Sequence, residues 1–224
     1  MILADSDTGL EYKLKCNGIN AIIAEEPHYY EKIIDKIYAQ INKTEETLRL
    51  YNEQNDLIDM SKSCSIFFSS ADLNYQNTRF QKKFLAYLVG EIESGAIKEK
   101  LLQNRADMLC IMEEIRNVSA YEISYEDQFS IADIIKSIGI RLESPVGKFA
   151  EKFMDCAQTY RDFIGTNLFF LVGCAGFITE EEFSYLQSWG VYQEITCIFI
   201  EYSDCRIPST AKKFIVDRDL CMIY

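Results

Sequence analysis

Two short segments in the last third of the chain are apolar at almost every position. Residues 167–172 read Asn-Leu-Phe-Phe-Leu-Val, and residues 195–200 read Ile-Thr-Cys-Ile-Phe-Ile. A strand can be apolar on both sides only if both faces of its sheet are covered, as is usual in parallel sheets. Between the two segments, Thr179 followed by three glutamates is typical of a helix start, and we expect this helix to run to about Trp189. The strand–helix–strand order predicts a parallel sheet covered on both faces.

The spacing of apolar residues changes in the middle of the chain. From about Thr78 they recur every three or four positions, which predicts two successive long helices. Their apolar stripes are Phe80, Phe84, Tyr87, Leu88 and Ile92 in the first, and Ile97, Leu101, Met108, Met112 and Ile115 in the second. Two further helices are predicted, one from Ser130 to about Gly139 and one over residues 149–164. The expected architecture is an α/β layer formed by residues 1–70 and 140–224, interrupted by a helical insertion at 71–139.

The N-terminal part predicts strands and one helix. Polarity alternates over residues 10–16, and Asn17-Gly18 then leads into the apolar residues 19–24, a pattern that predicts a β-hairpin. Pro27 suits the first turn of a helix that continues to about Ile41. Further strands are expected near residues 48–51, 57–60 and 65–68, with two short C-terminal strands around a turn at 217–219.

Composition places the chain among ordinary soluble globular proteins. It has 224 residues, of which 48% are hydrophobic and 26% charged. No stretch is apolar enough to span a membrane, and the first residues lack the basic start of an export signal, so we expect a cytosolic protein without a membrane partner. The eight cysteines never form a C-x-x-C pair and several lie in apolar runs, which favours reduced core thiols over zinc ligands or disulfides.

One short segment is basic in an otherwise acidic chain. The net charge is −12, which by itself argues against binding of nucleic acid, but residues 78–105 carry six basic and three acidic residues. Charge segregation makes five of these cations candidates for contacts with DNA phosphates: Arg79, Lys82, Lys83, Lys98 and Lys100. The same residues are equally consistent with a solvated helix surface. Lys212 and Lys213 form a smaller second candidate.

The usual signatures of catalysis are missing from the sequence. His28 is the only histidine, and no Gly-x-Ser-x-Gly elbow accompanies it, which disfavours a catalytic triad. Residues 172–176 contain two glycines after a predicted strand but lack the lysine of a phosphate-binding loop, so a tight turn is the simpler interpretation. ATP hydrolysis is therefore disfavoured.

Four carboxylates gather around the start of the third predicted helix. They are Glu122, Glu126, Asp127 and Asp133. Oxygen ligands in this arrangement could converge on one hard cation such as calcium or magnesium. The alternative is that Asp133 caps the helix and the other three interact favourably with its dipole.

Three segments of the chain resemble the type II-A CRISPR-associated adaptation protein family (Csn2-like). They are residues 122–143, residues 167–189 and residues 214–224. The resemblance implies a degenerate P-loop-like α/β head with a mostly parallel sheet, which has lost its nucleotide site, and an inserted α-helical leg. It also implies a non-enzymatic, ring-shaped homotetramer that binds Ca²⁺ and holds linear double-stranded DNA without reading its sequence.

The resemblance also assigns roles to residues and partners. Glu122, Glu126, Asp127 and Asp133 become the candidate calcium ligands, and the expected partners are DNA ends, the CRISPR integrase and the effector nuclease. Two alternatives stay open. One is a metal-dependent nuclease or phosphodiesterase that uses the same four carboxylates, since two-metal catalysis also needs clustered Asp and Glu. The other is a purely structural helical scaffold.

Overall fold

The computed structural model describes residues 1–44, 47–95, 97–125 and 130–223. The chain packs as two compact units. Unit 1 consists of Met1–Tyr75 together with Glu143–Tyr224, and unit 2 of Gln76–Leu142. Unit 2 is thus inserted in the sequence between the two parts of unit 1.

A largely parallel sheet forms the centre of unit 1. Its strands, in spatial order, are β10 (Met222–Ile223), β9 (Lys212–Val216), β3 (Gly18–Ala24), β8 (Thr196–Glu201), β7 (Leu168–Val172) and β6 (Cys64–Phe67). All neighbours are parallel except β10, which is antiparallel to β9. Every residue of β3 and β7 is buried, as their apolar sequences require. The predicted parallel sheet is confirmed.

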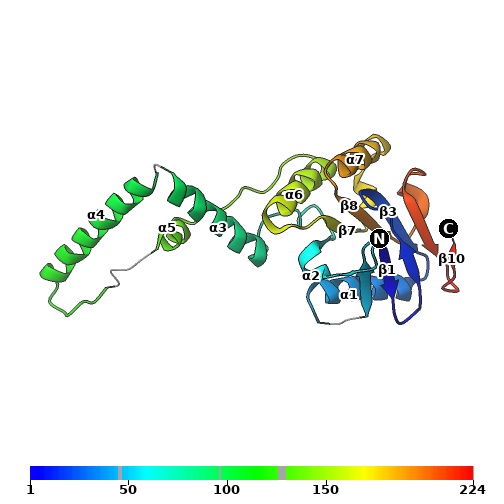
Figure 1. Cartoon of the computed structure of the whole chain (residues 1–224), viewed down its shortest axis with the longest axis horizontal. Coiled ribbons are helices and arrows are strands. Elements are labelled where there is room, and N and C mark those ends of the chain that lie inside the picture. Colours follow the sequence, from blue (N-terminus) through cyan, green and yellow to red (C-terminus); the bar gives the residue numbers. More distant parts are fainter. Residues whose placement is uncertain (45–46, 96, 126–129, 224) are drawn as a thin grey trace. The chain divides into compact units, whose positions relative to one another are not determined.

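Both faces of this sheet are covered, as Figure 1 shows. One face packs against α1 (Pro27–Ile41) and a small antiparallel sheet, with Ile33 and Ile37 of α1 in the same core as Phe170 and Ile198. The strands of the small sheet are, in order, β2 (Glu11–Lys13), β1 (Ile2–Asp5), β4 (Leu48–Tyr51) and β5 (Leu57–Ile58). The other face packs against α6 (Phe149–Ile164) and α7 (Glu180–Tyr192), where Phe153 meets Phe169 edge-on with ring centroids 5.6 Å apart.

The predicted N-terminal hairpin is wrong. β2 pairs with β1 in the small sheet, whereas β3 lies between β8 and β9 in the large one. Asn17 (φ 56°) and Gly18 (φ 118°) therefore carry the chain from one sheet to the other. A side chain at Gly18 would collide with the amide of Gln187, which accepts a hydrogen bond from the Ile19 amide at 2.8 Å. An entirely apolar strand gains more by burial on both faces than by pairing with an alternating partner, and this overrides the local turn signal.

The predicted helix ends are confirmed. Thr179 and Glu182 form a capping box at the start of α7, and Gly165 ends α6 in the left-handed conformation with φ 72°. Short helical turns complete unit 1: α2 (Met60–Ser63), η1 (Ala175–Phe177) and η2 (Asp204–Arg206). All eight cysteines are free, and four of them, Cys64, Cys156, Cys174 and Cys197, are buried.

Unit 2 consists of three helices in its described residues. They are α3 (Thr78–Ser94), α4 (Ile97–Val118) and α5 (Ile131–Ile138), and α3 contacts both of the others. α3 buries Phe80 and Phe84, whose rings stack 6.2 Å apart. α4 buries none of its side chains among the described residues, and most of the apolar stripe predicted for it is exposed there, with Leu101 half-buried. The exposed fraction is 51% for Met108 and 42% for Ile115.

Candidate functional site

The predicted metal ligands fall around the start of α5. Glu122 is exposed, whereas Glu126 and Asp127 lie outside the described residues. Asp133 belongs to a capping box: its Oδ2 accepts hydrogen bonds from the Ser130 backbone amide at 2.9 Å and from the Ser130 hydroxyl at 2.6 Å. The Ser130 hydroxyl is the main cause that holds the pKa of Asp133 below its ordinary value. Asp133 is therefore ionised at neutral pH.

The capping role leaves part of the Asp133 carboxylate available. Among the described residues, Oδ1 has only a loose ion pair with Lys136, at 3.8 Å, in a solvent-exposed setting. Such a pair contributes little to stability, so Oδ1 could still bind a cation while Oδ2 caps the helix. The described residues contain no cluster of three metal-binding side chains. Convergence of the four carboxylates on one ion stays a prediction.

The predicted DNA-binding cations lie on two helices of unit 2. Arg79, Lys82 and Lys83 lie in the first half of α3, and Lys98 and Lys100 lie in the first turn of α4. The four lysines are exposed and Arg79 is half-buried. Arg79 and Lys83 are four residues apart and so share one side of α3. Lys98 and Lys100 are two residues apart and diverge.

The carboxyl ends of the parallel strands carry a feature that bears on phosphate binding and that the sequence did not indicate. Ligands of doubly wound α/β proteins usually bind at this edge, with phosphates at a helix N-terminus. Here Glu26, which follows β3, occupies the N-terminus of α1. Its carboxylate accepts hydrogen bonds from the backbone amides of His28 at 3.1 Å and Tyr29 at 2.6 Å.

Glu201 makes a similar contact at the same edge. It ends β8, and its Oε1 accepts a hydrogen bond at 2.8 Å from the backbone amide of Ala175, in the turn that follows β7. Burial is the main cause that raises its pKa above the ordinary value. Tyr30 of α1 lies nearby: burial, and secondarily the charge of Glu201, raise the pKa of its hydroxyl.

Two glutamates of the chain thus take amides that could otherwise bind a phosphate group. The glycine-containing segment 172–176 forms a turn, with Gly173 at φ 64°, in agreement with the expectation from its missing lysine. His28 is exposed at the start of α1. The only local signal for the Glu26 contact was a glutamate directly before the proline of a predicted helix start, and no sequence pattern marks Glu201.

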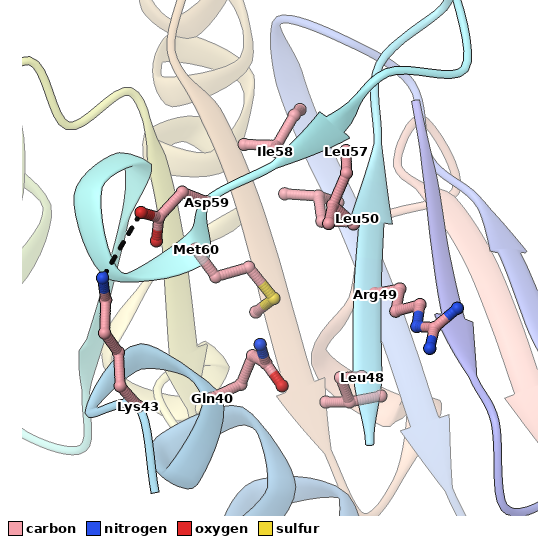
Figure 2. A pocket seen from close by; sticks show the side chains of 9 residues that line it. All are labelled: Gln40, Lys43, Leu48, Arg49, Leu50, Leu57, Ile58, Asp59 and Met60. Atoms are coloured by element: carbon pink, nitrogen blue, oxygen red, sulfur yellow. Dashed lines mark ion pairs between the residues drawn. The ribbon is translucent and has the colours of Figure 1, made fainter. Parts of the chain in front are cut away.

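Unit 1 also contains a pocket of about 340 Å³ between α1, β4, β5 and α2, shown in Figure 2. Gln40 and Met60 point into it, whereas Arg49 extends from the opposite side of β4. Asp59 is its one carboxylate among the described residues, and it caps α2 through the Ser61 amide and pairs with Lys43 at 3.5 Å. The Ser61 hydroxyl is the main cause that lowers the pKa of Asp59 to about 2. With its carboxylate engaged in this way, the pocket offers no free general base among its described side chains.

The described residues define a mixed α/β protein with two sheets, one of them largely parallel, and a helical insertion. The chain belongs to the CRISPR-associated Csn2 family: the model of that family, described as CRISPR-associated protein (Cas_Csn2), matches residues 40–220. Membership indicates a role in CRISPR adaptation. A comparison with curated proteins finds no match. No helix among the described residues is both long and apolar enough to cross a membrane.

Proposed function

We propose that this chain is a non-catalytic protein that binds the ends of linear double-stranded DNA, without reading sequence, during CRISPR spacer acquisition. The observation that carries the proposal is the group of exposed lysines on α3 and α4 in a chain of net charge −12. Contacts with phosphates need exposed cations but no particular base-reading side chain. Membership of a CRISPR-associated family supports this interpretation.

An acidic protein can bind a polyanion only if the positive and negative side chains of the protein lie on separate surfaces. The cations must line a surface of their own, and the carboxylates must be neutralised or turned away from the DNA. We propose that Ca²⁺ does the second through Glu122, Glu126, Asp127 and Asp133. Assembly of four copies into a ring would then combine weak phosphate contacts at high effective concentration.

The proposal includes no nucleotide. Glu26 and Glu201 accept hydrogen bonds from backbone amides at the sheet edge where a degenerate P-loop-like head would once have held phosphates. An incoming phosphate would have to displace a carboxylate and would be repelled by it. The proposed partners are DNA ends, the CRISPR integrase and the effector nuclease.

Size-exclusion chromatography with light scattering tests the assembly. We expect a tetramer with calcium, a smaller species with chelator, and a shift of linear duplex but not of closed circular duplex. A monomer that ignores both calcium and DNA would contradict the proposal. So would cleavage of linear DNA in Mg²⁺ or Mn²⁺ that disappears in the Glu126→Ala, Asp127→Ala double variant, because that result would indicate a metal-dependent nuclease.

The lysines themselves can be tested by salt dependence. We expect the Lys83→Gln, Lys98→Gln, Lys100→Gln variant to bind linear duplex more weakly. The slope of log affinity against log salt should become shallower by about 0.9 for each phosphate that the variant no longer neutralises. The matched control is Lys13→Gln, which removes an exposed lysine from unit 1. Equal salt slopes for wild type and the triple variant would remove these lysines from the DNA surface.

A further inference from the structure

Unit 2 contains an apolar hollow of about 240 Å³ between α3 and α5. Phe84, Leu85 and Leu88 of α3 form one wall, and Ile135 of α5 and Ile140 form the other. Phe84 and Ile135 are 7% and 3% exposed, whereas Ile140 is 46% exposed. The hollow is therefore fixed by buried side chains on the inside and open to solvent on one side.

Two lysines flank this hollow. Lys82 of α3 and Lys136 of α5 both line it and both are exposed. Within the described part of the chain Lys82 pairs with no carboxylate, and Lys136 has only the loose 3.8 Å pair with Asp133. Since Asp133 is already engaged by Ser130, Lys136 can turn to an incoming carboxylate at little cost.

The size of the hollow indicates what it can hold. Sites for small molecules and cofactors usually measure about 300–1,000 Å³. A volume of about 240 Å³ falls below that range, but it suits one large apolar side chain of a protein segment. Anchoring of a single bulky side chain in a preformed pocket is a common mode of protein recognition.

We infer that the hollow between α3 and α5 is a docking site for a partner protein, and that it receives a helical segment presenting one bulky apolar side chain between carboxylates. The apolar walls take the anchor, and Lys82 and Lys136 pair with the carboxylates on either side. The inference assigns Lys82, one of the predicted DNA-binding cations, to this docking surface instead. The side of α3 that carries Arg79 and Lys83 is a separate one, and the inference goes beyond the proposed DNA binding.

Fluorescence anisotropy with a labelled synthetic peptide tests the site. The probe is a helical peptide with leucine anchors flanked by aspartate and glutamate, compared with one carrying lysines in their place and one carrying serine anchors. We expect the acidic peptide with leucines to bind the full-length protein best. In Lys82→Glu, Lys136→Glu the preference should reverse toward the lysine peptide, with each exposed pair contributing about two- to fivefold.

The apolar wall has its own matched pair of variants. Ile140→Asp should weaken binding by roughly tenfold, because it places a charge against the anchor. Val191→Asp, a change at a similarly exposed position on α7 of unit 1, should leave binding unchanged. Three results would overturn the inference. The acidic and lysine peptides could bind equally, or the double variant could keep the preference of wild type. Laurate, a small apolar carboxylate, could also bind as tightly as the peptide, which would indicate a small-molecule site. Duplex retention, measured on the wild-type protein, tests the DNA proposal separately: peptide binding without DNA binding supports this site alone.

Discussion

A buried ion pair joins α1 to the small antiparallel sheet of unit 1. Lys36 of α1 is 4% exposed, and its Nζ lies 2.5 Å from Oδ1 of the fully buried Asp5 on β1. Asp7 adds a second carboxylate at 3.0 Å, and Lys36 is the main cause that lowers the pKa of Asp7. Removal of one partner of such a pair leaves a buried charge without compensation, which costs far more than the pair contributes.

We expect Lys36→Met to lower the free energy of unfolding by on the order of 3–5 kcal/mol. The double variant Asp5→Asn, Lys36→Met should recover part of that loss, because it removes both charges. Urea denaturation of wild type, Lys36→Met, Asp5→Asn and the double variant measures the difference. An additive result, with the double variant less stable than either single variant, would show that the two charges do not depend on each other.

Glu201 should make stability depend on pH in the opposite sense to most carboxylates. Its folded pKa is raised above the ordinary 4.5, so its charged form is disfavoured in the fold. Stability therefore falls as the pH rises through 4.5 toward the raised value. Glu201→Gln keeps an acceptor for Ala175 and removes the charge, so its melting temperature should exceed that of wild type at pH 7 and match it near pH 4. Glu181→Gln, an exposed control, should show no such pH-dependent difference in melting temperature from wild type.

At the scale of elements, Asp133 at the start of α5 has two roles that substitutions can distinguish: it caps the helix, and it is a proposed calcium ligand. Ser130→Ala removes the cap but keeps the Asp133 carboxylate, and should cost about 1 kcal/mol of helix stability. Asp133→Asn keeps an acceptor for Ser130 but removes the charge, so it should lower calcium affinity with less effect on helicity. Circular dichroism and calcium titration measure the two effects. If Ser130→Ala lowers the calcium affinity as severely as Asp133→Asn, the capping role and the ligand role of Asp133 are not separable.

Elements defined by local signals could be predicted from the sequence. The capping residues Thr179 and Ser130 and the terminal glycines Gly139 and Gly165 act within one turn of chain, and the predicted helix ends agree with the structure. Elements defined by distant partners could not be predicted in the same way. The β1 strand was missed, and Asn17-Gly18 joins two sheets instead of two paired strands, because strand partners are chosen by burial across the whole of unit 1.

The candidate sites show the same difference between contacts that are local in the sequence and contacts between distant residues. The capping box of Asp133 was among the alternatives that the spacing allowed, because its partner Ser130 is three residues away. The contact of Glu201 with Ala175 joins residues 26 positions apart and follows from strand order alone. Calcium ligation and DNA binding stay predictions, because both depend on groups that the chain meets only in a complex.

At the scale of the whole molecule, the exposed stripe of α4 suits the proposed assembly. Four residues of this stripe are more than 40% exposed: Ile97, Met108, Ile111 and Ile115. The last three follow each other at steps of three and four residues, and Ile97 lies about three helical turns before Met108. A helix with this pattern usually packs against another apolar surface. We propose that a second copy of the chain supplies this surface in the proposed tetramer.

We expect Met108→Glu, Ile115→Glu to shift the calcium-bound protein to a smaller species in light scattering, with the melting of unit 1 unchanged. Tyr192→Glu is the control, since Tyr192 is 83% exposed on α7 of unit 1. An unchanged mass for the double variant would place the subunit contact elsewhere.

The position of β3 between β8 and β9 has a consequence for biosynthesis. The strand leaves the ribosome early, but its two neighbours begin at Thr196 and Lys212, after the whole of unit 2. At roughly 5–20 residues per second, β3 waits on the order of ten to forty seconds for both of them. During that interval an entirely apolar strand lacks both of its sheet neighbours, so we expect α1, which follows it directly in the chain, to shield it first.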